Sequence, residues 1–229
     1  MNGFTLYDGP SRIGGARIVA IATGFRSPSA NRKTGAMVQT WILRADRSPT
    51  EAVKTGADAA ICGGCPHRGR KGKRRSCYVN VGQAPQGIWR AWKRGSYPEV
   101  PTEPADSLLG RMWRLGAYGD PAAIPLAVWT DTLARFQASG HTGYTHQWKS
   151  KRLADALELC QASVDSPADT VGLESYFRVT RDPGDLLPGE TLCPAYANGT
   201  TCLECGLCDA SGHKIVVPVH GSGAVHFND

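Results

Sequence analysis

Short apolar segments with the composition of β-strands alternate along this chain with segments of helical spacing. Strands are expected at 16–22, 37–43, 57–62, 78–81, 111–117, 143–148, 159–164, 176–180 and 214–219. Helices are expected at 85–95, 124–139, 151–157 and 168–175. Strands that alternate with helices build parallel βαβ units. We therefore expect a single α/β domain over residues 1–229, arranged as a small or incomplete (β/α) barrel with a C-terminal Cys-rich metal-binding loop.

Seven of the eight cysteines fall into two clusters. One cluster lies in CPAYANGTTCLECGLC and the other brackets CGGCPHRGRKGKRRSC. The N-terminus has neither the basic nor the apolar region of a secretory signal, so we expect a cytoplasmic protein (host cytoplasm for a phage-encoded one). Clustered cysteines in a reducing compartment indicate metal binding in preference to disulfides.

The C-terminal loop, residues 193–213, supplies four thiols from Cys193, Cys202, Cys205 and Cys208. Zinc held by four cysteines is our first expectation, with His213 as a substitute for one ligand. An iron–sulfur cluster uses the same ligands and stays open as an alternative.

The upstream set, Cys62, Cys65 and Cys77, lacks an obvious fourth ligand. His67 or the distant Cys160 could complete it, although a cysteine at the start of a strand, such as Cys160, is more often a small buried hydrophobe. The spacing of this set differs from the CxxxCxxC of radical S-adenosylmethionine enzymes.

The net charge of +6 comes from one loop insertion, residues 62–77. Without its six basic residues, 20 basic residues balance 20 acidic ones. A concentrated basic loop is typical of contact with nucleic-acid phosphates, and a solvated surface loop is the alternative. The residues concerned are Arg68, Arg70, Lys71, Lys73, Arg74 and Arg75. No apolar run is long enough to span a membrane, so we expect no membrane partner.

Reacting groups of parallel α/β folds gather in the loops that follow the strands. That rule selects Asp120 and Asp165 as a nucleophile and its acid/base partner, with helix capping as the alternative role for each. It also selects Asn31 and Lys33 as nucleic-acid or base contacts.

Tyr144, His146 and Trp148 alternate along an expected strand, so they share one face. Such a face can stack on or hydrogen-bond a flat base, which makes Tyr144 and His146 candidate base-binding residues. Aromatic core packing with a hydrogen-bonded histidine is the alternative.

Several strings cover nearly the whole chain and carry a resemblance: YDGPSRIGG, NRKTGAMVQTWIL, CGGCPHRGRKGKRRSCYVNVGQAP, RLGAYGDPAAIP, TGYTHQW and TTCLECGLC. They resemble a Cys-rich family of phage and plasmid proteins, and beyond it the phage 7-deazaguanine DNA transglycosylases of the queuine tRNA-ribosyltransferase superfamily. The chain is shorter than those tRNA enzymes, and its CxxCxxC spacing differs from their CxCxxC followed by a distant histidine.

The resemblance implies a barrel enzyme with a structural zinc that exchanges guanine in DNA for a 7-deazaguanine base. It implies that Asp120 or Asp165 attacks the sugar C1′ while the other manages protons. The expected partners are then nucleic acid, with DNA preferred to RNA, and the deazaguanine base. Two other functions stay open: an iron–sulfur enzyme related to radical S-adenosylmethionine enzymes, and a non-catalytic zinc module that binds nucleic acid.

Overall fold

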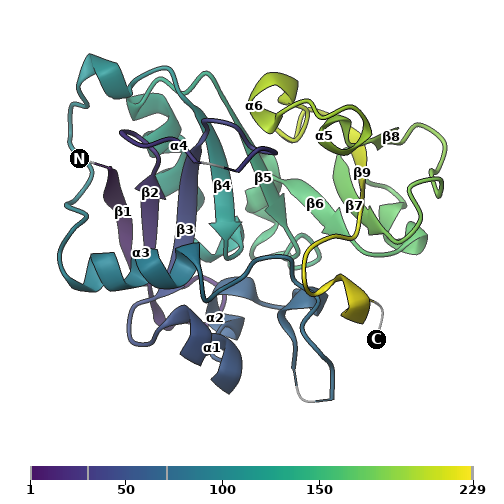
Figure 1. The fold of residues 1–229 in the computed structure, drawn as a ribbon, viewed down its shortest axis with the longest axis horizontal. Coiled ribbons are helices and arrows are strands. Elements are labelled where there is room, and N and C mark those ends of the chain that lie inside the picture. The colour runs from purple at the N-terminus through teal and green to yellow at the C-terminus, as the bar shows by residue number, and fades with distance from the viewer. Residues whose placement is uncertain (1, 30, 71, 228–229) are drawn as a thin grey trace.

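The computed structural model describes residues 2–29, 31–70 and 72–227, which form a nine-stranded sheet in the order β1-β2-β3-β4-β5-β6-β7-β9-β8 (Figure 1). The strands are β1 (Gly3–Pro10), β2 (Arg17–Thr23), β3 (Val38–Arg44), β4 (Met112–Tyr118), β5 (Gly140–Thr145), β6 (Gln161–Val164), β7 (Tyr176–Thr180), β8 (Thr191–Leu192) and β9 (Lys214–Pro218). The first three pair antiparallel, and every pair from β3 onward is parallel.

Short helices connect these strands. The α-helices are α1 (Pro49–Thr55), α2 (Ala59–Cys62), α3 (Ala84–Lys93), α4 (Leu126–Arg135), α5 (Pro194–Ala197) and α6 (Cys202–Cys205). Single 3₁₀ turns occupy Pro66–Arg68, Asp106–Leu108, Pro121–Ala123, Ala154–Glu158, Pro167–Thr170 and Ala224–His226. The basic loop folds into two arms, residues 63–70 and 72–77, which we call the basic hairpin. In Figure 1, α1, α2 and the basic hairpin lie below the edge to which the parallel strands point.

The main core surrounds β2, β3 and β4. Residues 18–23 of β2 are all buried, which explains why its apolar run does not alternate with polar residues. Phe25, Trp113 and Phe136 pack around the sheet with ring centroids 5.1 to 5.7 Å apart. Their packing fixes the antiparallel half of the sheet against α4 and leaves the opposite edge to the polar loops.

The α/β class is confirmed, whereas a closed barrel is not formed: β1 and β8 are the two ends of the described sheet. The expected helices at 151–157 and 168–175 are replaced by 3₁₀ turns. The expected helix at 124–139 is confirmed as the shorter α4. Only 15 residues separate β5 from β6 and 11 separate β6 from β7, and such short crossovers leave little room for a full helix.

Three strand predictions were wrong in detail. Residues 57–62 contain α2, because three alanines there favour a helix. Residues 78–81 form no strand, and β5 begins at Gly140 and ends at Thr145, earlier than expected. The strand β1 was missed because its sequence, GFTLYDGP, is interrupted by polar and turn-forming residues.

Candidate functional site

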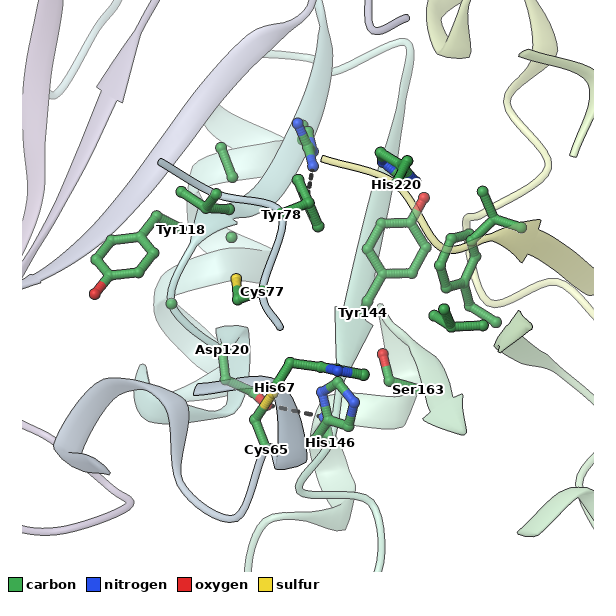
Figure 2. A pocket seen from close by; sticks show the side chains of 18 of the residues that line it. Cys65, His67, Cys77, Tyr78, Tyr118, Asp120, Tyr144, His146, Ser163 and His220 are labelled. Atoms are coloured by element: carbon green, nitrogen blue, oxygen red, sulfur yellow. Dashed lines mark hydrogen bonds between the residues drawn. The ribbon is translucent and has the colours of Figure 1, made fainter. Parts of the chain in front are cut away.

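A cavity of about 340 Å³ lies at the carboxyl ends of the parallel strands. Loops after these strands supply its polar residues: Asp120 follows β4, His146 follows β5 and His220 follows β9. Figure 2 shows Cys65, His67 and His146 together at one end and Tyr78, Tyr144 and His220 at the other. The strand-end rule therefore brings Asp120 and His146 to this cavity, and Tyr144, near the end of β5, lines it too. Asn31 and Lys33 also line the cavity, but they come from the loop between β2 and β3, which lies at the amino ends of the parallel strands because β2 is antiparallel to β3.

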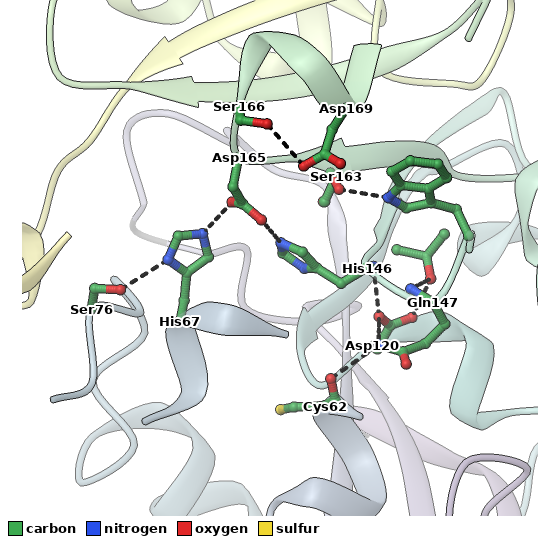
Figure 3. A network of polar contacts seen from close by, with 12 residues as sticks. Cys62, His67, Ser76, Asp120, His146, Gln147, Ser163, Asp165, Ser166 and Asp169 are labelled. Carbon is green, nitrogen blue, oxygen red and sulfur yellow. Dashed lines mark hydrogen bonds and ion pairs between the residues drawn. The ribbon is translucent and has the colours of Figure 1, made fainter. Parts of the chain in front are cut away.

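Asp120 lines the cavity with a carboxylate whose hydrogen-bonding capacity is used by four donors. Its Oδ1 accepts from Ala122 N at 3.0 Å and Thr145 Oγ1 at 2.7 Å. Its Oδ2 accepts from His146 N at 2.9 Å and Gln147 Nε2 at 3.1 Å (Figure 3). The bond to Ala122 N caps the 3₁₀ turn after β4, so the capping role considered for this residue is present. These contacts fix the loop that carries His146.

Asp165, the residue after β6, lies between two histidine rings (Figure 3). Its Oδ1 is 2.6 Å from His67 Nε2, and its Oδ2 is 3.4 Å from His146 Nε2. His67 Nδ1 is 2.9 Å from Ser76 Oγ, which fixes the other side of that ring. The two histidine rings line the cavity, whereas the contacts of Asp165 are with the rings.

The charges within this cluster are strongly coupled. Burial alone would raise the pKa of Asp165, but hydrogen bonds from His146 and His67 and their positive charge hold it well below its usual range. Burial alone would lower the pKa of His146, but the negative charges of Cys65 and Asp165 and hydrogen bonds to both raise it well above its ordinary value. The result is a carboxylate anion beside an imidazolium cation.

The upstream cysteines line the same cavity. Cys62 ends α2, Cys65 follows three residues later, and Cys77 lies on the returning arm of the basic hairpin. Burial raises the pKa of the Cys62 thiol, and the charges of Cys65 and Cys77 raise it further, so the three thiols are neighbours. His67, expected to complete this set, is instead bonded through both ring nitrogens to Asp165 and Ser76.

The four C-terminal cysteines gather around α6. Thr201 and Glu204 form a capping box that fixes the start of this helix. Burial and the charges of the other three thiols, partly offset by a hydrogen bond with Tyr144, raise the pKa of Cys208 to about 12. Four thiols are the donor types of zinc and iron–sulfur sites, although among the described residues no three cysteine sulfurs lie within 4.8 Å of one another. Cys160, considered for the other set, is buried at the start of β6.

His67, His146 and Asp165 are residue types that commonly bind metal ions. Among the described residues they form a cluster in which one ligand atom from each lies within 4.8 Å of the other two. Two imidazoles and a carboxylate are donors for a transition-metal dication. The same three side chains are also bonded directly to each other, so their geometry is equally that of a histidine–carboxylate proton-transfer group.

The basic hairpin divides into two parts. Arg68 donates to Asp58 Oδ1 at 2.7 Å, and Arg75 donates to backbone carbonyls; both side chains line the cavity. Arg70 and Arg74 are exposed near the tip, where the backbones of Arg70 and Lys73 form an antiparallel β-bridge. Lys71 lies outside the described residues. The expected single basic surface is thus partly an inner wall and partly a projecting tip.

Several cavity residues were missed by sequence reasoning. Arg114, Phe177 and His220 line the cavity, and the Tyr144 and Phe177 rings lie 4.4 Å apart between centroids. A charged residue inside the buried strand MWRLGAY was the available signal for Arg114, because an arginine there must face a polar space. Trp148, placed with Tyr144 and His146 on one face, instead donates from Nε1 to Ser163 O at 2.8 Å and packs beside β6.

A scan against protein-family models found no match, and neither did searches of curated proteins and of solved structures. Among the described residues, none of the helices has the length and apolar character needed to cross a bilayer.

Proposed function

We propose that this protein is a nucleic-acid-modifying enzyme that holds a nucleobase in the cavity and exchanges guanine for a 7-deazaguanine base. The observation that carries the proposal is one cavity that combines aromatic walls, basic side chains and two histidine rings, with the ionised carboxylate of Asp165 directly behind those rings. An extruded base needs an aromatic pocket, and the attached backbone needs positive charge. We interpret the parallel strands β3 to β7, which follow chain order in the sheet, as part of an incomplete (β/α) barrel with this site at its carboxyl edge.

The reactive carboxylate in this proposal is Asp165. Four donors occupy both oxygens of Asp120. In the described part of the chain the side chain of Asp165 contacts two histidine rings, and it is 24% exposed. Attack on the sugar C1′ therefore falls to Asp165, and Asp120 is a positioning residue that fixes His146.

His146 acts as the general acid and then as the general base. As the C1′–N9 bond breaks, the electron pair goes to guanine, which takes a proton from the imidazolium while Asp165 bonds to C1′. The incoming base then attacks C1′ through N9, Asp165 leaves with its electron pair, and the N9 proton returns to His146. The C-terminal cysteines would hold zinc, which would stabilise the last turn of the fold.

The test is incubation of purified protein with guanine-containing DNA and an isotope-labelled 7-deazaguanine base, followed by nucleoside mass spectrometry. We expect labelled deazaguanosine in the DNA and released guanine in equal amounts. Salt-dependent DNA binding with no incorporation would instead indicate the non-catalytic zinc module.

A second candidate function is an iron–sulfur enzyme, favoured by one observation: Cys62, Cys65 and Cys77 are neighbours on the cavity wall. Three thiolates beside a substrate cavity suit a cluster with an open iron position, which would supply redox chemistry there. Iron and sulfide analysis after anaerobic purification separates the two functions. Substoichiometric iron together with base exchange supports the transglycosylase.

A further inference from the structure

We propose that Arg114 and Lys33, on the cavity wall beside His220, form an anion subsite that binds a phosphate group of the substrate nucleotide. The choice of a nucleotide phosphate rests on the proposed function, whereas the need for an anion follows from the charges themselves.

Arg114 is a cation in the middle of the sheet. It projects from the central strand β4 into the cavity, where its Nη2 donates to Tyr78 Oη at 2.5 Å. Neither Arg114 nor Lys33 forms an ion pair with any carboxylate in the described part of the chain. A half-buried guanidinium without a counter-charge attracts an anion, so the site favours one.

The carboxylates of the cavity wall do not supply this counter-charge. Asp58 and Asp120 are the acidic side chains that line the cavity in the described residues. Asp58 is paired with Arg68, and the carboxylate of Asp120 is used by four donors. The missing negative charge must therefore come from a bound group or from the thiolates.

Lys33 and His220 both lie close to Arg114. Burial lowers the pKa of His220, and the positive charges of Lys33 and Arg114 lower it further. The Lys33 loop is fixed by a hydrogen bond from Cys202 N to Lys33 O at 2.7 Å. The His220 ring stacks on Tyr78, with centroids 5.3 Å apart (Figure 2).

A bound phosphate suits Arg114 and Lys33 better than the negative charge of the nearby thiolates does. The Arg114 fork and the Lys33 ammonium supply several donors to an oxyanion, which has acceptors in several directions. Cys202 is a neighbour of Arg114, so a thiolate-bound metal centre is the rival source of negative charge. That rival would compensate Arg114 without using Lys33, so the two explanations differ in what Lys33→Gln should do.

The experiment is calorimetric titration of the metal-replete protein with deoxyguanosine 5′-monophosphate and with deoxyguanosine. We expect the monophosphate to bind at least about tenfold more tightly, or about 1.4 kcal/mol, since the phosphate forms hydrogen bonds to charged groups. Arg114→Gln and Lys33→Gln should each remove most of this preference. Lys54→Gln, an exposed lysine on α1 outside the cavity, is the matched control and should retain it.

Equal affinity for the two probes in the wild-type protein would overturn the inference. So would a preference that survives Lys33→Gln, a surface variant expected to fold normally even where Arg114→Gln does not. If Arg114→Gln loses bound zinc but keeps the phosphate preference, Arg114 balances the charge of the thiolates and the inference is wrong. Because titration needs no turnover, a phosphate preference without base exchange would contradict only the proposed function.

Discussion

Asp120→Asn separates a positioning carboxylate from a reacting one. Asparagine keeps one oxygen for two of the four donors and turns its own N–H groups toward the other two. Each buried donor left without an acceptor costs about 1–3 kcal/mol, so the variant should lose roughly 2–6 kcal/mol of unfolding free energy. For a chain of this size the melting temperature should fall by on the order of 10 °C.

The assay is urea and thermal denaturation followed by circular dichroism, with Asp169→Asn as control. Asp169 is a partly exposed carboxylate at the same edge, paired with Lys149 and Ser166, and its loss should cost less than about 1 kcal/mol. An Asp120→Asn protein with wild-type stability and no base exchange would refute the reasoning, because it would make Asp120 the reacting group.

The remaining predictions concern other parts of the fold. The side chain of Glu190 is buried against Arg178. Burial would raise the pKa of Glu190, but the hydrogen bond from Arg178 outweighs burial and lowers it. The pair therefore stabilises the protein above the unfolded-state pKa of Glu190, and this stabilisation is lost as the pH falls through the folded-state pKa. Glu190→Gln should cost on the order of 3 kcal/mol at neutral pH and flatten acid denaturation curves. Gly63→Ala would place a Cβ 2.2 Å from Gln147 Oε1 and should lower both stability and activity, measured in the same assays. Zinc in excess of the thiolate sites should inhibit base exchange by ligating Asp165; a requirement for that extra zinc would contradict this account.

The α/β class and the position of the cavity could be predicted from the sequence because both depend on local pattern. Strands such as β2 and β9 carry continuous apolar residues, and polar residues after parallel strands share one edge by topology. The extent of the helices could not be predicted, since short crossovers override helical spacing near Lys151 and Ala168.

The distinction between the two aspartates also lay beyond sequence. Asp120 and Asp165 each lie within two residues of the end of a strand, and each is followed by a proline within two residues. Only long-range partners separate them: Gln147 and Thr145 hold one, and His67, 98 residues away in the chain, holds the other. Contacts of this kind depend on packing and leave no local pattern.

The most direct test of the central claim is the rate of labelled base incorporation into DNA by Asp165→Asn, with Asp169→Asn as the matched control. The amide removes the negative charge that holds His146 as an imidazolium and supplies the nucleophile. We predict that incorporation falls at least about 100-fold in Asp165→Asn, with the fold retained, and is unchanged in Asp169→Asn. Wild-type incorporation by folded Asp165→Asn would contradict the claim.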